Sequence, residues 1–286
     1  MPLEISTYGI LNPQEGLTRF RLERYPPAVD LAPFIERHWI VRWDLRGCSP
    51  YEQETLPHPC VNLVFEASGA AVHGVGTRRH VAHLEGKGRV VGVKFKPGGF
   101  FPWSRGPVST LTERAVPLRE ALDLDGEDDI ERRVLACEDD RVAISLVEEL
   151  LRVRLLVRDA QVESVVRLVA IARDDPSIAS VEALASAAAM TPRTLQRLFH
   201  RYVGVGPKWV IRRCRIHEAA ERCRDGARVD WAALAHDLGY CDQPHFSREF
   251  KAQIGRTPSE YAAWCASLPP ASAPPRSPRG GQHEPG

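Results

Sequence analysis

The chain has 286 residues, of which 43% are hydrophobic and 26% are charged, and its formal net charge at pH 7 is +1. This composition is typical of a soluble globular protein, and the length suits two domains better than one. No apolar run approaches 18 residues, which excludes a transmembrane helix. The first ten residues have neither the basic nor the apolar region of a signal peptide, so we expect a cytoplasmic protein.

The small net charge conceals an asymmetry along the chain. Residues 177–266 contain 13 Lys and Arg against 9 Asp and Glu, a net charge of +4, whereas residues 1–176 carry −4. A basic C-terminal part is consistent with nucleic-acid binding at that end only, although a surplus of this size is modest. The seven cysteines are scattered and none has the CxxC spacing, so free thiols are expected.

The first hundred residues favour β-strands. Apolar and β-branched stretches at 38–45, 60–67 and 89–97 are separated by Gly, Pro and polar turns, and residues 72–84 predict two more short strands. From residue 109 the apolar residues take helical spacing, in 118–124, 127–155 and 159–175. The order predicts an α+β multidomain protein, with a β-rich domain and a helical connector in residues 1–160.

A junction follows these helices. Pro176 ends the preceding helix, and Ser180 is placed to cap the next one from Val181. Beyond it, residues 161–266 predict an all-α domain. Residues 267–286 are rich in Pro, Gly and Ser and contain one large apolar residue, so we expect a disordered tail.

Residues 181–261 contain one pattern twice, about 50 residues apart. Ala183, Leu184 and Ala185 match Ala233, Leu234 and Ala235; after one inserted residue, Arg197, Phe199, Gly204 and Pro207 match Arg248, Phe250, Gly255 and Pro258. Each copy predicts a short Ala/Leu helix, a tight turn, and a second helix with one apolar and one polar face. This is the pattern of a helix-turn-helix, whose second helix enters the DNA major groove.

In the first unit, Thr191 is a good N-cap and Pro192 suits the first turn, so we expect the recognition helix to begin at Pro192. Arginine side chains suit guanine and glutamine side chains suit adenine. Exposed Arg and Gln are also common on solvated helices, and the presence of two copies in register is what favours DNA binding. The DNA-binding set expected here is Arg193, Thr194, Gln196, Arg197 and His200.

In the second unit, Gly239 is expected in a left-handed turn, and Asp242 can cap the helix that follows. Between the units, residues 207–226 predict one long amphipathic helix, with Trp209 and Ile216 packed inside and its arginines outward. Such a helix can hold two recognition helices about 34 Å apart, in successive major grooves. The DNA-binding set expected in the second unit is Gln243, His245, Ser247, Arg248 and Lys251.

These residues carry a family resemblance. Through LAxxAxMTPRTLQRLFxxxVGxxP and ALAxxLGYxDQxHFSREFKxxxGxTPSEY, residues 177–264 resemble the DNA-binding domain of the AraC/XylS family of bacterial transcriptional regulators. The resemblance implies seven helices that bind two adjacent major grooves. Two residues depart from the family pattern, namely Pro244 at a usually polar or small position and Ala262 where an Arg commonly stands. The base-contacting residues that the resemblance implies are Arg193, Gln196, Arg197, Gln243, Ser247 and Arg248.

Residues 56–66 and 91–103 resemble, more weakly, the N-terminal regions of a subset of the same family. In well-studied relatives that region is a small β-barrel that binds an effector and dimerises, so the resemblance implies a cupin-like barrel in residues 1–160 that serves as a sensor or self-association domain. Phe100, Phe101 and Trp103 lie among glycines and prolines, which predicts a tight aromatic loop that either lines a pocket or plugs the barrel.

Other readings of the N-terminal half stay open. Imidazoles and a thiolate from His58, Cys60, His73, His80 and His83 are ligands for zinc or copper, and such a site would suit a metal-dependent barrel enzyme. No pair has a recognised ligand spacing, so we expect surface or hydrogen-bonded histidines, no metal and no other cofactor. A redox sensor at Cys48 or Cys60 is a further alternative, although nothing nearby predicts a lowered thiol pKa.

The sequence therefore predicts a DNA-binding transcriptional regulator that is not an enzyme. Its expected partners are double-stranded DNA, a small-molecule effector and RNA polymerase, and the chain is expected to be a monomer or a homodimer. Effector binding or dimerisation is expected to act through residues 130–175, by changing how they present the DNA-binding domain.

Overall fold

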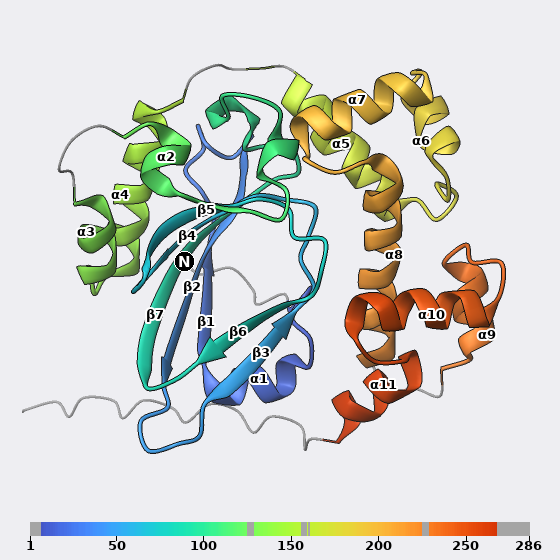
Figure 1. The fold of residues 1–286 in the computed structure, drawn as a ribbon, viewed down its shortest axis with the longest axis horizontal. Helices are drawn as coiled ribbons and strands as arrows, with labels where there is room; N and C mark the ends of the chain where they lie inside the picture. Colours follow the sequence, from blue (N-terminus) through green and yellow to red (C-terminus); the bar gives the residue numbers. More distant parts are fainter. Residues whose placement is uncertain (1–6, 125–128, 156–158, 160, 225–228, 268–286) are drawn as a thin grey trace, which may run out of the picture.

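Two antiparallel sheets form the N-terminal part of the protein (Figure 1). The structure is a computed structural model that describes residues 7–124, 129–155, 159, 161–224 and 229–267. Within these ranges the large sheet has six strands, in the order β1 (Arg21–Tyr25), β2 (Ile35–Asp44), β7 (Lys87–Phe95), β4 (Asn62–Glu66), β5 (Gly69–His73) and β8 (Ala115–Pro117). The small sheet pairs β3 (Tyr51–Thr55) with β6 (His80–Leu84), and helix α1 (Pro13–Arg19) precedes β1.

The two faces of the large sheet have different neighbours. One face carries Ile40, Phe65, Val91 and Val93, which share the main core with helices α3 (Ile130–Ala136) and α4 (Asp140–Val153). The opposite face carries Leu22, Trp39 and Val41, which pack against Tyr51 and Leu84 of the small sheet. The strands thus alternate between two apolar environments, as the period of two along a β-strand requires. The short helix α2 (Leu118–Leu122) follows β8.

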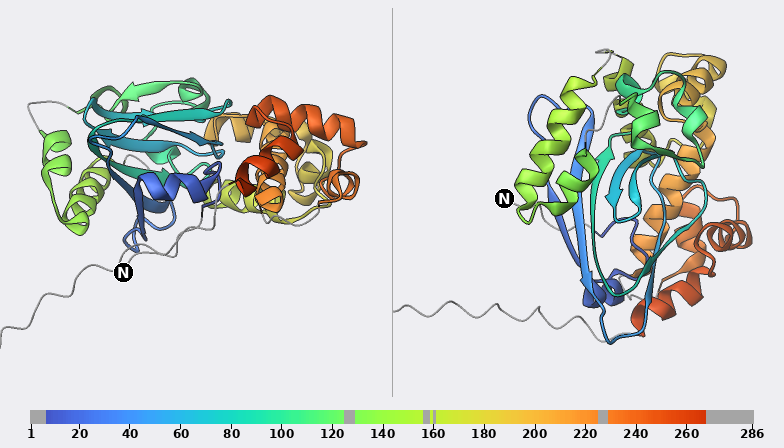
Figure 2. Two further views of the ribbon diagram at one scale, coloured as in Figure 1. Left: turned by 90° about the horizontal axis from the view of Figure 1, so that it is seen from below. Right: turned by 60° about the vertical axis from the view of Figure 1, so that its left-hand side comes forward.

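The C-terminal part is helical and lies beside the sheets, on the side away from α3 and α4 (Figures 1 and 2). Helix α8 (Pro207–Arg224) is its central element. The first unit, α6 (Val181–Ala187) and α7 (Pro192–Tyr202), packs on α8 together with α5 (Gln161–Asp174). The second unit is α9 (Trp231–Asp237) and α10 (Gln243–Ile254), followed by α11 (Pro258–Ala266), which also packs on α8.

The helical part shares its cores with the N-terminal part. Leu195 and Phe199 of α7 belong to the same buried cluster as Phe95, the last residue of β7, and Trp103, which lies in the segment after β7. The core of the second unit takes in Leu11 and Leu56 from the N-terminal part. Each unit therefore has its own apolar attachment to the sheets, and the N-terminal part fixes where the two units stand.

The structure confirms the expected β-rich region followed by helices, with one correction. The described strands form two separate sheets rather than a closed barrel, because β3 and β6 pair with no other named strand, and Thr55 of β3 makes only an isolated bridge with Ile10. The five predicted strand segments correspond to β2, β4, β5, β6 and β7. The sequence analysis missed β1, β3 and β8, whose polar or very short sequences hide the alternation. The expected tail after Ser267 lies outside the described residues, as does the predicted end of the long helix at 225–226.

Candidate nucleic-acid interface

The turn of the first unit forms as its residues dictate. Ser180 Oγ accepts a hydrogen bond from the Ala183 amide at 3.1 Å and begins α6, and Thr191 Oγ1 accepts one from the Thr194 amide at 3.1 Å and begins α7. Pro192 occupies the first position of α7, where an amide hydrogen would have no helical partner. The start of the recognition helix is therefore fixed by side-chain capping, as the sequence predicted.

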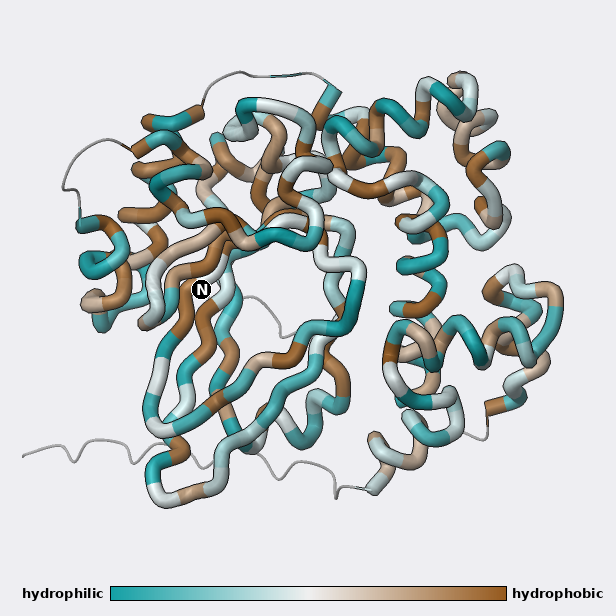
Figure 3. The backbone as a smooth tube through the Cα atoms, in the orientation of Figure 1, coloured by the Kyte–Doolittle hydropathy of each residue, from teal (hydrophilic) through white to brown (hydrophobic). Residues whose placement is uncertain are grey.

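Helix α7 separates its residues cleanly into two faces (Figure 3). Leu195 and Phe199 are fully buried, and Tyr202 is buried at the C-terminal end. The whole set expected to bind DNA is exposed: Arg193, Thr194, Gln196, Arg197 and His200. Five polar side chains suited to base edges and phosphates thus lie together on one helix, and the N-terminal part leaves them uncovered.

The second unit repeats this arrangement with one difference. Asp242 caps α10 through a 2.6 Å hydrogen bond from the His245 amide, and Pro244 fits in the first turn, so it leaves the helix start at Gln243. Gln243, Arg248 and Lys251 are exposed, whereas His245 and Ser247 are half-buried. The ring of His245 lies edge-on to Tyr240, and its Nε2 is 3.9 Å from Glu249, so this side chain is held against the protein.

The prediction that the arginines of α8 point outward was wrong for two of them. Arg213 and Arg215 are 1% and 6% exposed. Arg213 donates to the Thr77 carbonyl at 2.5 Å and stacks on Trp209, and Arg215 donates to the carbonyls of Asp175, Pro176 and Ile178 at 3.0–3.2 Å. These arginines anchor α8 to neighbouring segments through backbone oxygens, which helical periodicity alone does not reveal.

Both recognition helices are held at their C-terminal ends by the N-terminal part. Gly204 follows α7 with a φ of +99°, and its carbonyl accepts a 2.6 Å hydrogen bond from Thr112 Oγ1. Gly255 follows α10 with a φ of +87°, and the neighbouring Ile254 carbonyl accepts one from Arg79 at 3.4 Å. Only glycine adopts such angles without strain and allows so close an approach. The paired glycines of the repeat are therefore docking points.

More contacts extend this attachment around each unit. Phe101, in the 3-10 helix η1 (Phe101–Trp103), packs on Tyr202 with ring centroids 4.1 Å apart. Val108, in η2 (Val108–Leu111), lies against Gly204. On the second unit, Glu54 forms 2.7 Å ion pairs with both Arg79 and Arg256. The contacts come from β3, the loops after β5 and β7, and η2. Helix α5, within the segment 130–175 where the coupling was expected, also packs against α7 and α8.

Comparison with known proteins agrees with this geometry. Residues 184–263 match a family described as "Helix-turn-helix domain". A putative AraC-like transcription regulator from Streptomyces antibioticus is 38% identical over 89 residues, and one from Streptomyces lividans is 36% identical over 89 residues. Residues 184–263 are a helix-turn-helix domain of the AraC family. Each match covers 31% of this chain and 29% of the relative, so the chain spans less than a third of the curated relatives it matches.

Outside the AraC-type domain, residues 23–117 match a family described as "Domain of unknown function (DUF6597)". Among solved structures, the chain is similar to the C-terminal domain of AraT, a response regulator from Geobacillus stearothermophilus, at 23% identity and a TM-score of 0.32, over 34% of this chain and 82% of that one. It is also similar to ToxT from Vibrio cholerae, at 10% identity and a TM-score of 0.41, over 86% and 98% of the two chains.

The candidate metal ligands do not come together. Within the described ranges no three His, Cys, Asp or Glu side chains gather as a metal site would require. His80 and His83 are exposed on β6, and His58 stacks on His217 of α8. Burial raises the pKa of the Cys60 thiol to about 11, which opposes the thiolate that a redox sensor needs.

The aromatic loop is part of the core rather than the wall of a pocket. Phe100 and Trp103 are buried with Phe95 and Phe34, and the Trp103 indole donates to the Leu151 carbonyl at 2.8 Å. Phe101 points to Tyr202 of α7. The loop therefore joins the large sheet, α4 and the first helix-turn-helix unit.

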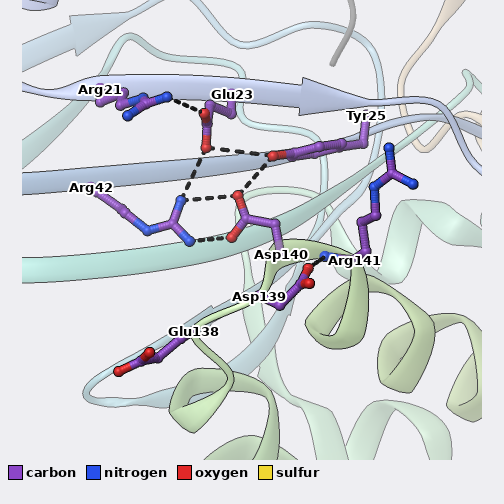
Figure 4. Close-up of a pocket in the computed structure, with 8 residues that line it drawn as sticks. All are labelled: Arg21, Glu23, Tyr25, Arg42, Glu138, Asp139, Asp140 and Arg141. Carbon is purple, nitrogen blue, oxygen red and sulfur yellow. Dashed lines mark hydrogen bonds and ion pairs between the residues drawn. The ribbon is translucent and has the colours of Figure 1, made fainter. Parts of the chain in front are cut away.

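A polar surface pocket of about 450 Å³ lies between the large sheet and the start of α4 (Figure 4). Asp140 is its centre and accepts hydrogen bonds from Tyr25 at 2.8 Å, Arg89 at 2.9 Å and Arg42. Burial opposes ionisation of Asp140, but the bonds from Arg42 and Tyr25 outweigh it and lower the pKa of this carboxyl to about 2. The carboxylate of Asp140 is paired with the guanidinium groups of Arg42 and Arg89, so we infer that this cluster holds α4 against the sheet.

Proposed function

We propose that this protein is a sequence-specific transcriptional regulator that binds double-stranded DNA through α7 and α10, each reading one of two adjacent major-groove segments. Residues 161–266 serve as the DNA-binding domain and residues 1–160 as a domain that senses a small molecule or mediates self-association. Arg193, Gln196 and Arg197 of α7 and Gln243, Ser247 and Arg248 of α10 contact bases. Thr194, His200, His245 and Lys251 contact the backbone or flanking bases.

The observation that carries this proposal is the equivalence of the two units. Each recognition helix begins at a side-chain cap. Phe199 of α7 and Phe250 of α10 stand at matched positions of the repeat and are buried, whereas the matched arginines Arg197 and Arg248 are exposed. Helix α8 has 18 residues, so it spans about 27 Å along its axis, which suits two helices in successive turns of one DNA face.

Regulation would act on the spacing of the units. Because Thr112 docks on the end of α7 and Arg79 on the end of α10, a change in the N-terminal part alters where both helices stand. An effector shifts the equilibrium between the arrangement that binds DNA and one that does not only if its affinities for the two arrangements differ.

The experiment is selection of binding sites from random duplexes by the full-length protein at fixed, physiological salt, since affinity for DNA depends steeply on ionic strength. We expect enrichment of a motif with two half-sites centred about one helical turn apart. The same selection with Arg167→Ala, a change of equal charge at an exposed residue of α5 outside the proposed contact set, should return the same motif. Absence of any enriched motif, with and without cell extract as a source of effector, contradicts sequence-specific binding.

A further inference from the structure

Three basic side chains lie on one face of the large sheet, two of them buried and Arg37 half-buried. Arg24 lies on β1, Arg37 on β2 and Lys94 on β7, and the register sets Arg24 opposite Trp39 and Arg37 opposite Lys94. Arg24 is 5% exposed and Lys94 is 7% exposed. By the alternation of the strands they share a face with Leu22, Trp39 and Val41, the residues that pack against the small sheet. The basic groups therefore point toward the layer between the two sheets.

A β-bulge gathers the charges. Ile35 pairs with Phe95 and Arg37 with Lys94, which leaves Glu36 as the extra residue of β2. The bulge brings both Glu36 and Arg37 to Lys94, as bulges commonly re-aim side chains near sites. Glu36 accepts a 3.0 Å hydrogen bond from Lys94 Nζ and one from Arg37. The Glu36 carboxylate is thus hydrogen-bonded to two of the three basic groups, those of Lys94 and Arg37.

Arg24 forms no ion pair within 4.0 Å among the described residues, although the charge of Glu36 acts on it and opposes the lowering of its pKa. Its Nε and Nη1 atoms are buried and have no hydrogen-bond partner among the described residues. Burial and the neighbouring Arg37 lower the pKa of Arg24 to about 10, so the guanidinium still carries its charge at neutral pH. A buried charge without a hydrogen-bonded partner is costly, and a bound anion would supply that partner. Guanidinium groups bind carboxylates and phosphates in a two-pronged geometry.

An aromatic surface adjoins the cations. A Cβ atom added to Gly92 would lie 2.0 Å from the Trp39 ring, so the indole lies flat over the Gly92 backbone between Arg24 and the centre of the sheet. Val41 continues this apolar surface along β2. Charged donors beside an aromatic plane suit a ligand with an anionic head and an apolar body.

We propose that the layer between the sheets binds a small organic anion, a carboxylate or a phosphate ester, with its charged group on Arg24 and Arg37 and its apolar part on Trp39. If the protein is a regulator, this site makes a small organic anion its effector. That regulatory role rests on the proposed function, whereas the binding of an anion does not depend on it. Lys94 and Arg37 also face His58, which stacks on His217 of α8. A bound anion would change the field at the contact between the sheets and α8.

The first test needs no ligand. Arg24→Met removes a buried charge whose Nε and Nη1 have no hydrogen-bond partner among the described residues, and keeps the apolar bulk, so the melting temperature of the ligand-free full-length protein should rise. Arg89→Met is the matched control, because Arg89 lies on the same sheet but is paired with Asp140 at 2.9 Å; its melting temperature should fall. A fall of the same size for Arg24→Met would make Arg24 a structural arginine and overturn the proposal.

The second test measures binding by thermal shift at constant ionic strength. The probes are benzoate, octanoate and phenyl phosphate, with benzyl alcohol and octanol as neutral counterparts. We expect the carboxylates or the phosphate ester to raise the melting temperature of the wild type by about 2–4 °C, and to leave Arg24→Met unchanged. Equal shifts in both proteins, equal shifts by the neutral compounds, or no shift by any anion would overturn the proposal. No DNA is present, so failure here and failure of DNA selection are separate results.

Discussion

The imidazole rings of His58 and His217 stack with their centroids 4.2 Å apart and their planes 12° from parallel. His58 belongs to the loop after β3 and His217 to the middle of α8, so the pair joins the N-terminal part to the helix that carries both DNA-binding units. Each ring approaches a backbone carbonyl, that of Tyr8 at 3.1 Å from His58 and that of Pro57 at 3.4 Å from His217. Burial of both rings favours their neutral forms, and two charged rings at this distance would repel each other.

This stack predicts a loss of stability in acid. Burial, together with Lys94, holds the pKa of His58 well below its usual range, and burial with Arg213 lowers the pKa of His217 to about 3. An unfolded histidine titrates near 6.5, so below about pH 6.5 the unfolded chain binds more protons and stability falls as pH falls. Each histidine contributes a slope of at most about 1.4 kcal/mol per pH unit.

Urea unfolding at pH 7.5, 6.0 and 5.0 measures this dependence. His217→Phe keeps a stacked ring and removes one titrating group, so its unfolding free energy should fall less steeply over the same range. His236→Phe, at an exposed position of α9, should keep the wild-type slope. Identical slopes for the wild type and His217→Phe would show that the stack does not cause the acid sensitivity.

The ion pairs of Glu54 predict selective loosening of the second unit. Glu54→Gln leaves Arg79 and Arg256 without their carboxylate, and because the Glu54 side chain is only 15% exposed we expect a cost of about 1–2 kcal/mol. Amide hydrogen exchange should accelerate in α10 and α11 while α7 stays protected. As a control, Glu163→Gln removes an exposed i,i+4 ion pair with Arg167 and should change neither the unfolding free energy nor the exchange rates. Equal acceleration in α7 would mean that the two units are not attached independently.

The two turns predict a stabilising substitution. Ala189 has a φ of +49°, whereas the matched residue of the second unit, Gly239, has +77°. A non-glycine residue in this region costs about 1 kcal/mol, so Ala189→Gly should raise the unfolding free energy by roughly 0.5–1 kcal/mol. Gly239→Ala should lower it by a similar amount. Urea denaturation measures both, and a destabilised Ala189→Gly would show that the turn is relaxed with alanine.

Much of the helical part could be predicted because its determinants are local. Thr191, Asp242 and Gly239 act on backbone within four residues, so caps and turns follow directly from their identities. No local residue type predicts the left-handed turn at Ala189, since alanine favours a helix. We attribute its positive φ to the packing of α6 on α7. The register of the repeat, which sets Ala189 against Gly239, was the one available hint.

The attachment between the two parts could not be predicted, because its determinants are distant in sequence. Arg213 and Arg215 are buried by the carbonyls of Thr77 and Asp175, residues that no periodicity connects with α8. The bulge at Glu36 that gathers Arg37 and Lys94 depends on strand register, which a single sequence does not specify. The closed barrel was expected from a resemblance, and the pairing of β3 with β6 alone replaces it by two sheets.

The matched arginines predict the energetics of DNA binding. Arg197→Ala or Arg248→Ala should each weaken binding to the selected site by about 1–3 kcal/mol, roughly 5- to 150-fold, with a smaller loss on random DNA. Fluorescence anisotropy with labelled duplexes at fixed salt measures both affinities. Arg167→Ala, which changes the charge equally on α5, should bind both duplexes like the wild type. Equal losses on selected and random DNA would mean that these arginines contact only phosphates.

Repeating the selection from random duplexes with Arg197→Ala and with Arg248→Ala tests the central claim most directly, because it assigns each half of the motif to a helix. If α7 and α10 each read one major-groove segment, Arg197→Ala relaxes base preference in one half-site, Arg248→Ala relaxes it in the other, and the spacing between them stays the same. Two variants that relax the same half-site, or that both return the wild-type motif, would contradict the account.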